Sequence, residues 1–594
     1  MKRRRAAGWA GVAAVAAGFT PWPLSSARVA EGLNDGRGAS PRLIWEAPQA
    51  ATFSAFPWPN LRIVDARLDG PSGSNLISAP AARIDLSLGA LLSGRLAPEK
   101  AVLAAPTMTL DLDRPPFTPK GGLTNVAILA SALGTLTGLS LSDGVLRVVS
   151  QARGLDTVVE KVQGGLDGLV PGRSLRVNLS AIWRGAPITI FLSVTDPVLT
   201  ASGAPSGFSA ALASPVTNLA VSGSLAGGAR PSLAGDFSAS SPSLAALARL
   251  LGREAPSFLV ADDVAIAGKV KATPTGITLD EATATSAGQT IRGALQVAGL
   301  GDRPNVSATL DSDKIALAAL FGPLAPVFGP NGEWSGRPFS AAPPSNFDLD
   351  LRLSARRLDV YGHELADLAA SAMLKHGVLT ASLVDGAAYG GRLKGEIRLA
   401  GVERNLQLDA RAELADADFG AAFSDFGWPG PTGKGRAEFA VRTAGLSPAA
   451  AMADLGGSAT LRLERGGVEG VNLEQALRRS QRRPLDAARD MRVGMTAFNR
   501  LSLEFAIGKG VAHVVNGDLV AQGVVADLQG AIDLAGQSWK LRVNATQTDA
   551  TGKESRDAAH LNLAIEGPWS QPTIGAADAR DASPTAADPP AAAP

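Results

Sequence analysis

Apolar and polar residues alternate along most of this chain, so that every second side chain is hydrophobic over many short runs. A period of two places successive side chains on opposite faces of a β-strand. The clearest alternating runs are residues 84–88, 108–112, 175–181, 188–194, 347–353, 406–414, 501–507 and 539–543. Each run presents one face to an apolar environment and the other to water. The pattern therefore predicts a mainly antiparallel β protein with one wet face.

Short glycine-containing segments separate several of these runs. Arg184-Gly185-Ala186 lies between two alternating runs, which predicts a β-hairpin. A polar residue, a glycine, a valine and an apolar residue recur in Ser142–Leu146, Lys375–Leu379 and Gly508–Ala512. We expect a hairpin turn at each of these three places.

Short helices are expected where a strand runs into an Asp or Ser residue, because such side chains cap the first turn of a helix. This arrangement occurs three times and closes on a glycine each time, at Gly252, Gly322 and Gly427. A longer helical stretch, Leu473–Met491, carries four arginines before Pro484. These arginines form either a solvated face or a surface for anionic lipid headgroups.

The chain opens with the basic run Met1–Arg5, followed by an uncharged and mostly apolar stretch that reaches Ala27. A basic head before an apolar run is typical of a segment that enters a membrane and leaves the basic residues in the cytoplasm. Ser25-Ser26-Ala27 offers small residues for cleavage of a signal peptide. Ala6–Leu24 also has about the minimum length of an uncleaved anchor. The residues alone leave both interpretations open.

Composition divides the remainder of the chain. Residues 329–345 are rich in Gly, Pro and Ser and are interpreted as a linker between two β regions, residues 28–328 and 346–574. Residues 575–594 contain Ala, Pro and Asp but no large apolar residue. Such a tail buries too little surface to offset its ordering entropy, so we predict that it is disordered.

Charge and composition exclude several classes of function. The 56 basic and 55 acidic side chains leave a net charge of +1, which argues against a nucleic-acid-binding protein. The chain has no cysteine and only four histidines, so thiol chemistry is excluded and a histidine-built metal site is not expected. No P-loop, GxSxG or HExxH motif occurs. We therefore predict no enzyme activity, no catalytic or metal-binding residue and no cofactor.

The remaining ionisable residues are interpreted as parts of the wet surface. The four histidines lie in separate predicted strands or turns, at His363, His376, His513 and His560. Asp348 and Asp350 share one strand face, as a catalytic pair of carboxylates would. The same spacing recurs in many other predicted strands, so a solvated face is the better interpretation.

Two sets of short segments follow one another in a fixed order. The set between Phe347 and Thr546 spans about a third of the chain and comprises Ala355–Leu358, Tyr361-Gly362, Gly377–Leu379, Tyr389–Leu393, Gly466–Leu473, Thr496–Phe498 and Gly530–Leu534. The set in the first hundred residues comprises Pro23-Leu24, Leu43–Trp45, Phe56–Pro59 and Leu61–Ile63. In order and spacing these segments resemble the AsmA family of Gram-negative envelope proteins, and Tyr389-Gly390-Gly391 resembles the YGG signature of that family.

The resemblance implies a fold like that of the chorein-type bridge-like lipid transfer proteins. In such a fold, a long, strongly curved antiparallel sheet with short helices forms an elongated open groove, here preceded by an N-terminal hydrophobic helix. It also implies that residues 1–27 are an uncleaved anchor in the inner membrane and that the bulk of the chain lies in the periplasm. The implied role is non-enzymatic transfer of phospholipid toward the outer membrane, with outer-membrane homeostasis as its result. The implied partners are phospholipids, the inner membrane and outer-membrane or periplasmic proteins.

The alternating strands supply an apolar face for such a groove. The candidate lining residues are Leu349, Leu351, Leu353, Leu406, Leu408, Leu461, Leu463, Leu501, Leu503 and Phe505. The same strands are also compatible with sheets that pair face to face as sandwiches with dry cores. In that case the chain is a structural or assembly factor for outer-membrane protein biogenesis and contains no lipid conduit.

Overall fold

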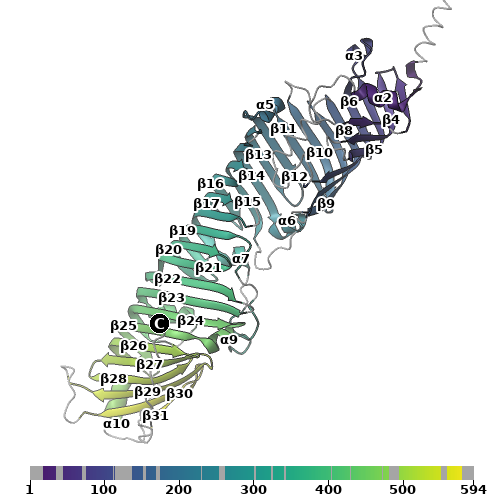
Figure 1. Cartoon of the computed structure of the whole chain (residues 1–594). Coiled ribbons are helices and arrows are strands. Elements are labelled where there is room, and N and C mark those ends of the chain that lie inside the picture. The colour runs from purple at the N-terminus through teal and green to yellow at the C-terminus, as the bar shows by residue number, and fades with distance from the viewer. Residues whose placement is uncertain are drawn as a thin grey trace, which may run out of the picture. The chain divides into compact units, whose positions relative to one another are not determined.

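The computed structural model describes residues 18–34, 44–47, 49–69, 75–111, 113, 137–151, 155–168, 174–228, 230–252, 261–299, 303–322, 326–339, 343–402, 405–427, 430–470, 472–480, 494–549 and 558–577. The chain divides into two compact units. The first contains Met1–Gly301 and Ala319–Gly322, and the second contains Asp302–Ala318 and Pro323–Pro594. Both are built almost entirely of β-strands (Figure 1).

Within its described residues, the first unit contains seventeen strands and four helices. They are β1 (Trp22–Leu24), α2 (Ser26–Asn34), β2 (Ile44–Glu46), β3 (Ala51–Ser54), β4 (Asn60–Asp69), β5 (Asn75–Leu86), α3 (Leu88–Leu92), β6 (Pro98–Ala104), β7 (Thr107–Asp111), β8 (Gly138–Ser150), β9 (Leu155–Asp167), β10 (Leu175–Trp183), β11 (Ala186–Val194), α5 (Pro197–Ala201), β12 (Ser206–Ala213), β13 (Asn218–Ala226), β14 (Ser232–Ser243), α6 (Leu244–Leu250), β15 (Asp262–Thr273), β16 (Gly276–Ser286) and β17 (Gln289–Ala298).

The second unit contains the remaining strands and three helices, and α7 (Leu317–Phe321) includes residues of both units. These elements are β18 (Asn305–Ala316), β19 (Asp348–Val360), β20 (His363–Lys375), β21 (Val378–Ala388), β22 (Gly391–Val402), β23 (Asn405–Asp418), α8 (Phe419–Asp425), β24 (Thr432–Gly445), α9 (Pro448–Asp454), β25 (Gly456–Glu469), α10 (Leu473–Ser480), β26 (Met495–Gly508), β27 (Val511–Ala521), β28 (Val524–Asp533), β29 (Ser538–Gln547), β30 (His560–Pro568) and β31 (Thr573–Ala576).

Most neighbouring strands pair antiparallel, which confirms the mainly β prediction. The chain runs as a meander from β8 to β17 and again from β19 to β31. The predicted, mainly antiparallel sheet contains parallel pairs as well, because β8 pairs parallel to β6 and β7, and β18 pairs parallel to β19. Parallel pairing requires a long connection that returns the chain to its starting edge. Residues 317–347 provide that connection between β18 and β19.

Three of the expected hairpin turns are confirmed by their backbone geometry. Arg184-Gly185, His376-Gly377 and Lys509-Gly510 each place two consecutive residues at positive φ. This geometry matches the twist of the flanking strands, and glycine adopts it without steric cost. The expected turn in Ser142–Leu146 is wrong, because this segment lies inside β8, where Asp143 has a positive φ and the register against β9 shifts. It is a β-bulge, which bends a strand instead of reversing it.

Bulges recur in both units. Register shifts fall beside the positive-φ residues Glu281 in β16, Asp367 in β20 and Asp416 in β23. Each bulge adds a residue to one strand of a pair and increases the local twist. Repeated bulges therefore account for the curvature of the strands visible in Figure 1.

Short helices follow strands at all three places expected from the sequence, but the expected Asp or Ser cap is present only at α6 (Ser243) and α8 (Asp418), because α7 follows Ala316 and Asp311–Asp313 lie inside β18. The three helices α6, α7 and α8 precede Gly252, Gly322 and Gly427, and each glycine has a positive φ. The Asp418 side chain accepts hydrogen bonds from the backbone N–H groups of Gly420 and Ala421 at the start of α8. This satisfies two of the donors that a helix leaves free at its first turn.

Each unit has one end where a helix covers the apolar face of the sheet. In the first unit, Val29 and Leu33 of α2 are buried in a cluster that includes Leu61, Ile63 and Ile84. α2 therefore closes the apolar face over β3 to β5 and neighbouring strands.

In the second unit, α10 has the same role. Its residues Leu473 and Leu477 are buried with Leu463, Leu501 and Leu563 of the strands. Of the helical stretch Leu473–Met491 expected from the sequence, α10 accounts for Leu473–Ser480, and residues 481–491 lie outside the described residues. Arg478 forms an ion pair of 2.5 Å with Glu474 on the exposed side of α10.

Residues 1–17, which carry most of the expected N-terminal hydrophobic helix, lie outside the described residues. Among the helices that the structure does describe, none has the length and apolar character required to cross a bilayer. The structure corrects the expected extent of the anchor at its C-terminal end. Trp22–Leu24 forms strand β1 and pairs with β3, and α2 begins at Ser26.

The segment 329–345, interpreted above as a linker, packs on the second unit where it is described. The Trp334 indole N–H donates to the carbonyl oxygen of Leu534 at 2.7 Å. The backbone N–H of Phe339 donates to the carbonyl of Leu446, and that of Ala449 donates to the carbonyl of Ser335. The division between the compact units lies instead at residues 301 and 302.

At the C-terminal end of the chain, β31 extends to Ala576, and residues 578–594 lie outside the described part.

The covering role of α10 makes a prediction about stability. Leu477 is 1% exposed in the core beneath α10, so Leu477→Ala is expected to reduce the free energy of unfolding of the second unit by about 3 kcal/mol, the usual cost of a leucine-sized cavity. The exposed Leu446 supplies the matched control, and Leu446→Ala is expected to cost less than about 1 kcal/mol. Urea denaturation of both variants checks this. Equal losses in the two variants would contradict the packing described for α10.

Candidate functional site

The strand register of the second unit places apolar side chains in rows that cross the sheet. Directly paired residues of neighbouring strands share a face, so each row can be followed from strand to strand. One row is Leu349, Leu374, Leu379, Leu399 and Leu408. A second row is Leu351, Ala372, Ala381, Ile397, Ala410 and Val441. A third is Leu353, Ala370, Leu383, Gly395, Ala412, Phe439, Ala459 and Phe505. The apolar face is therefore continuous from β19 to β26.

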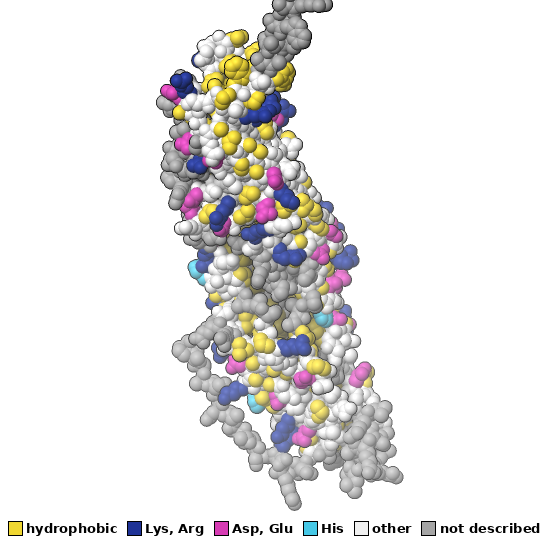
Figure 2. All heavy atoms as spheres, turned by 90° about the vertical axis from the view of Figure 1, so that its right-hand side faces the viewer, with side chains coloured by type: hydrophobic (Ala, Val, Ile, Leu, Met, Phe, Trp, Pro, Cys, Tyr) yellow, Lys and Arg dark blue, Asp and Glu magenta, His cyan; other side chains and the backbone are white. Residues whose placement is uncertain are grey.

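Large apolar side chains on this face remain accessible. Ile397 is 50% exposed and Phe439 is 43% exposed, although both belong to the apolar rows. Leu351 and Leu408 are half-buried. In an ordinary domain a second layer would bury such a face. Hydrophobic side chains accordingly reach the molecular surface in this unit and in the first (Figure 2).

The first unit carries a comparable apolar face. One row is Leu179, Ile190, Leu212, Leu219, Ala239, Ile266, Ala284 and Ile291. Leu219 in this row is exposed, as is Ile277 nearer the ends of β15 to β17. A small buried group in this stretch of the unit contains Val270, Leu279 and Ala282. Both units thus combine a helix-covered end with a more open stretch of apolar face.

The ten candidate lining residues fall into two environments. Six candidates are half-buried on the open stretch of the face. Five of them lie on β19 and β23 and the sixth on β26: Leu349, Leu351, Leu353, Leu406, Leu408 and Phe505. Leu461 and Leu503 are half-buried against the cluster beneath α10. Leu463 and Leu501 are fully buried inside that cluster. The two latter residues are therefore covered by the protein itself.

The opposite face of the same strands is charged. Arg436 of β24 forms ion pairs with Glu413 at 3.0 Å and with Glu438 at 2.6 Å. Arg462 of β25 pairs with Glu504 at 3.0 Å. These side chains are largely exposed to water, where an ion pair contributes little to stability. Their main consequence is that this face stays hydrated while the other face remains apolar.

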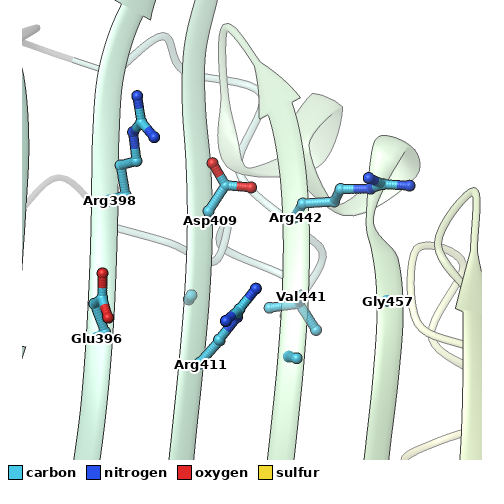
Figure 3. Close-up of a pocket in the computed structure, with 9 residues that line it drawn as sticks. Glu396, Arg398, Asp409, Arg411, Val441, Arg442 and Gly457 are labelled. Atoms are coloured by element: carbon cyan, nitrogen blue, oxygen red, sulfur yellow. The ribbon is translucent and has the colours of Figure 1, made fainter. Parts of the chain in front are cut away.

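A shallow hollow of about 520 Å³ lies on the charged side of β22 to β25. Asp409 lies between Arg398 and Arg442 on neighbouring strands, and Glu396 lies opposite Arg411 (Figure 3). Opposite charges directly across a strand pair stabilise the pairing modestly. The arrangement alternates in sign, so it belongs to the wet surface of the sheet.

The YGG segment has a physical explanation in the second unit. Tyr389 and Gly390 both have positive φ and form the turn between β21 and β22. A Cβ atom on Gly391 would lie 2.4 Å from the carbonyl oxygen of Ala415, so only glycine fits at that position. The Tyr389 hydroxyl donates to the carboxylate of Asp425 at 2.7 Å. The motif thus joins a tight turn to the end of α8.

Asp425 also contacts a histidine that the sequence suggested was an ordinary surface residue. His363 Nδ1 lies 2.6 Å from the Asp425 carboxylate, and its ring stacks on Phe426 at 4.7 Å. The hydrogen bonds from His363 and then Tyr389 lower the pKa of Asp425, and burial together with Asp425 raises the pKa of Tyr389 to about 12. The lowered carboxyl pKa means that this contact stabilises the fold above the usual Asp range and is lost as the pH falls through the lowered value.

This cluster fixes the position of α8 over one edge of the apolar face. Phe419 and Ala422 of α8 are buried against the cluster that includes Leu463, while Asp425 at its end is held by the two hairpins that carry His363 and Tyr389. The partners lie 62 and 36 residues from Asp425 in the sequence. Among the residues that the structure describes, no group of His, Asp and Glu side chains is arranged to hold a metal ion.

Removal of the Tyr389 hydroxyl is expected to loosen α8. In Tyr389→Phe the Asp425 carboxylate loses one donor, so the amides of residues 419–425 should exchange with solvent severalfold faster, as measured by hydrogen–deuterium exchange. Tyr361 takes the same positive-φ position in the neighbouring hairpin, and Tyr361→Phe serves as the control. An unchanged exchange rate in α8 of the first variant would show that the contact does not hold the helix.

The comparisons with known proteins bear on this part of the chain. The model of the AsmA family matches residues 327–516. The match covers β19 to β26, and with them the open apolar rows and the YGG turn. No curated protein and no solved structure matches the chain. The resemblance found in the sequence is therefore confirmed over residues 327–516, and this chain carries an AsmA family region.

Proposed function

We propose that this chain is a non-enzymatic protein of the bacterial envelope, anchored in the inner membrane, that shields the acyl chains of phospholipids during transfer toward the outer membrane. The observation that carries the proposal is the apolar face that remains accessible at Ile397 and Phe439 in the middle of the second unit. The AsmA family match over the same strands supports an envelope role. Phospholipids and the inner membrane are the proposed partners.

The composition of the rows suits hydrocarbon. Each methylene group moved from water to an apolar surface contributes about 0.8 kcal/mol, so a lipid on this face is held mainly by its tails. Leucines alternate with alanines and glycines in the rows, as at Ala372, Ala381 and Gly395, and this leaves space between the larger side chains. Neighbouring strands repeat the same surface every ~4.8 Å. A repeating surface has no single deep minimum, so a bound tail can move along it.

The proposed groove comprises the open stretch of the second unit and excludes its covered end. Leu349, Leu351, Leu353, Leu406, Leu408 and Phe505 are the candidate residues on the open stretch. Leu463 and Leu501 are buried by α10 and its neighbours, so we assign them to the core that closes the face. The opposite face, with Arg436 and Arg462 in ion pairs, is charged and exposed to water.

The N-terminal region supports an anchor that is retained. The carbonyl oxygen of Gly18 accepts hydrogen bonds from the backbone N–H groups of Ala55 and Phe56, and β1 pairs with β3. Cleavage at Ser25–Ala27 would remove this strand from the sheet. The basic run Met1–Arg5 would stay on the cytoplasmic side.

The proposal predicts that phospholipid accompanies the purified protein. Extraction in a mild detergent followed by lipid mass spectrometry is expected to detect phospholipid at a reproducible stoichiometry. Absence of phospholipid at every stage would overturn the proposal and would favour the structural or assembly role, in which the apolar face binds protein.

A pair of matched variants tests whether the apolar face holds the lipid. Leu351→Asp introduces a charge on the apolar row, and Arg352→Asp introduces the same residue on the exposed opposite face of the same strand. We expect Leu351→Asp to lower the amount of bound phospholipid severalfold and Arg352→Asp to leave it unchanged. Mass spectrometry of both proteins checks this, with circular dichroism as the control for folding. Equal losses would argue against a groove on this face.

A further inference from the structure

The first unit exposes a group of large apolar side chains that the proposed groove does not use. They gather where the described chain begins. Trp22 is 54% exposed and Trp58 is 51% exposed, and Phe19 and Phe56 are exposed beside them. The rings of Phe19 and Phe56 have centroids 5.8 Å apart. On the surface of a soluble protein, large exposed apolar residues usually occur singly, and a contiguous group of them marks an interaction site.

The backbone brings these residues to one edge of the sheet. Trp22 of β1 pairs with Phe53 of β3. The loop that follows β3 carries Phe56 and Trp58, and its residues Ala55 and Phe56 donate backbone hydrogen bonds to the carbonyl of Gly18. The aromatic side chains therefore lie around the point at which residues 1–17 join the described fold.

Helix α3 extends the group. The backbone N–H of Leu86 donates to the carbonyl of Pro59 at 2.8 Å, which places the start of α3 beside the loop that carries Trp58. Leu88 and Leu92 are four residues apart and share one side of the helix. Both are exposed, Leu92 to 84%, whereas Leu91 packs against the core of the unit. Figure 1 shows α3 at the same end of the first unit as β4 and α2. We call Phe19, Trp22, Phe56, Trp58, Leu88 and Leu92 the N-terminal patch.

The chemistry of the N-terminal patch fits the interfacial region of a phospholipid bilayer. Tryptophan combines a large apolar ring with an N–H donor, and it is enriched at the level of the lipid headgroups. Arg62 and Arg95 are exposed near the patch, and basic side chains are attracted to anionic headgroups. The preceding sequence supplies a second argument, since the uncharged stretch 6–17 follows a basic run and leads directly into Gly18 and Phe19, and Phe19 belongs to the patch.

We propose that the N-terminal patch inserts into the headgroup region of the membrane and rests this edge of the first unit on the bilayer surface. The proposal rests on the proposed anchoring and adds a second, protein-surface contact to it. The contact would orient the first unit and place the start of its sheet at the lipid surface. An anchor alone would fix neither the orientation of the first unit nor the distance of its sheet from the bilayer.

Because the chain contains no cysteine, single-cysteine variants of the full-length protein carry an environment-sensitive fluorophore at one position each. Trp58→Cys and Leu92→Cys place the label in the patch, and Thr275→Cys places it in the exposed turn between β15 and β16 of the same unit. The proteins are reconstituted in vesicles of phosphatidylethanolamine with a minority of phosphatidylglycerol. We expect a blue shift, and quenching by lipids that carry a nitroxide near the headgroup, for labels at positions 58 and 92 and not at 275.

Flotation of the vesicles on a density gradient separates the two proposals. Protein that floats with the vesicles while its labels at 58 and 92 remain in water overturns the patch and leaves the anchor in place. Protein that does not float overturns both. A blue shift that depends on protein concentration in the absence of vesicles assigns the patch to contact between copies of the chain, and thereby overturns the membrane assignment.

Discussion

The structure depends on the strand register, which keeps apolar side chains on one face over many successive strands. A shift by one residue in a single strand would exchange its faces and place a charged side chain in the apolar rows. The hairpin turns fix the register locally, because turns such as His376-Gly377 and Lys509-Gly510 allow only one pairing of the strands that they join. Each bulge shifts the register locally and bends the strand, and regular pairing resumes on either side of it. The accessible apolar surface is thus a product of many short-range constraints.

The sequence predicted those features that depend on neighbouring residues. The alternation, the hairpin at Arg184-Gly185 and the caps of α6 and α8 all follow from side chains within a few positions of one another. The direction of pairing between β18 and β19 does not, because alternation is the same in parallel and antiparallel strands. The bulge in Ser142–Leu146 also escaped, since a polar residue before glycine favours positive φ in a bulge as well as in a turn.

The depth of burial was the hardest property to predict for the candidate site. Leu463 and Leu408 both lie in runs that alternate apolar and polar residues, yet one lies under α10 and the other on the open face. The difference comes from a helix that folds back from residues 473–480, which alternation within a strand does not report. The contact of His363 and Tyr389 with Asp425 was not predicted for the same reason. These three side chains come from two hairpins and a helix that are distant in the sequence and meet only in the folded sheet. The motif around Tyr389 was visible, but its partner was not.

The covered end of the second unit limits the extent of the proposed lipid groove. Beneath α10 the apolar face is filled by Leu463, Leu477, Leu501 and their neighbours, whereas Phe505 of β26 remains on the open stretch. Under the proposed function, an acyl chain on the open rows would meet this packed core at the covered end. The groove that we propose is therefore bounded on this side by the packed residues beneath α10. The length of that groove is thus set by where α10 begins to cover the strands.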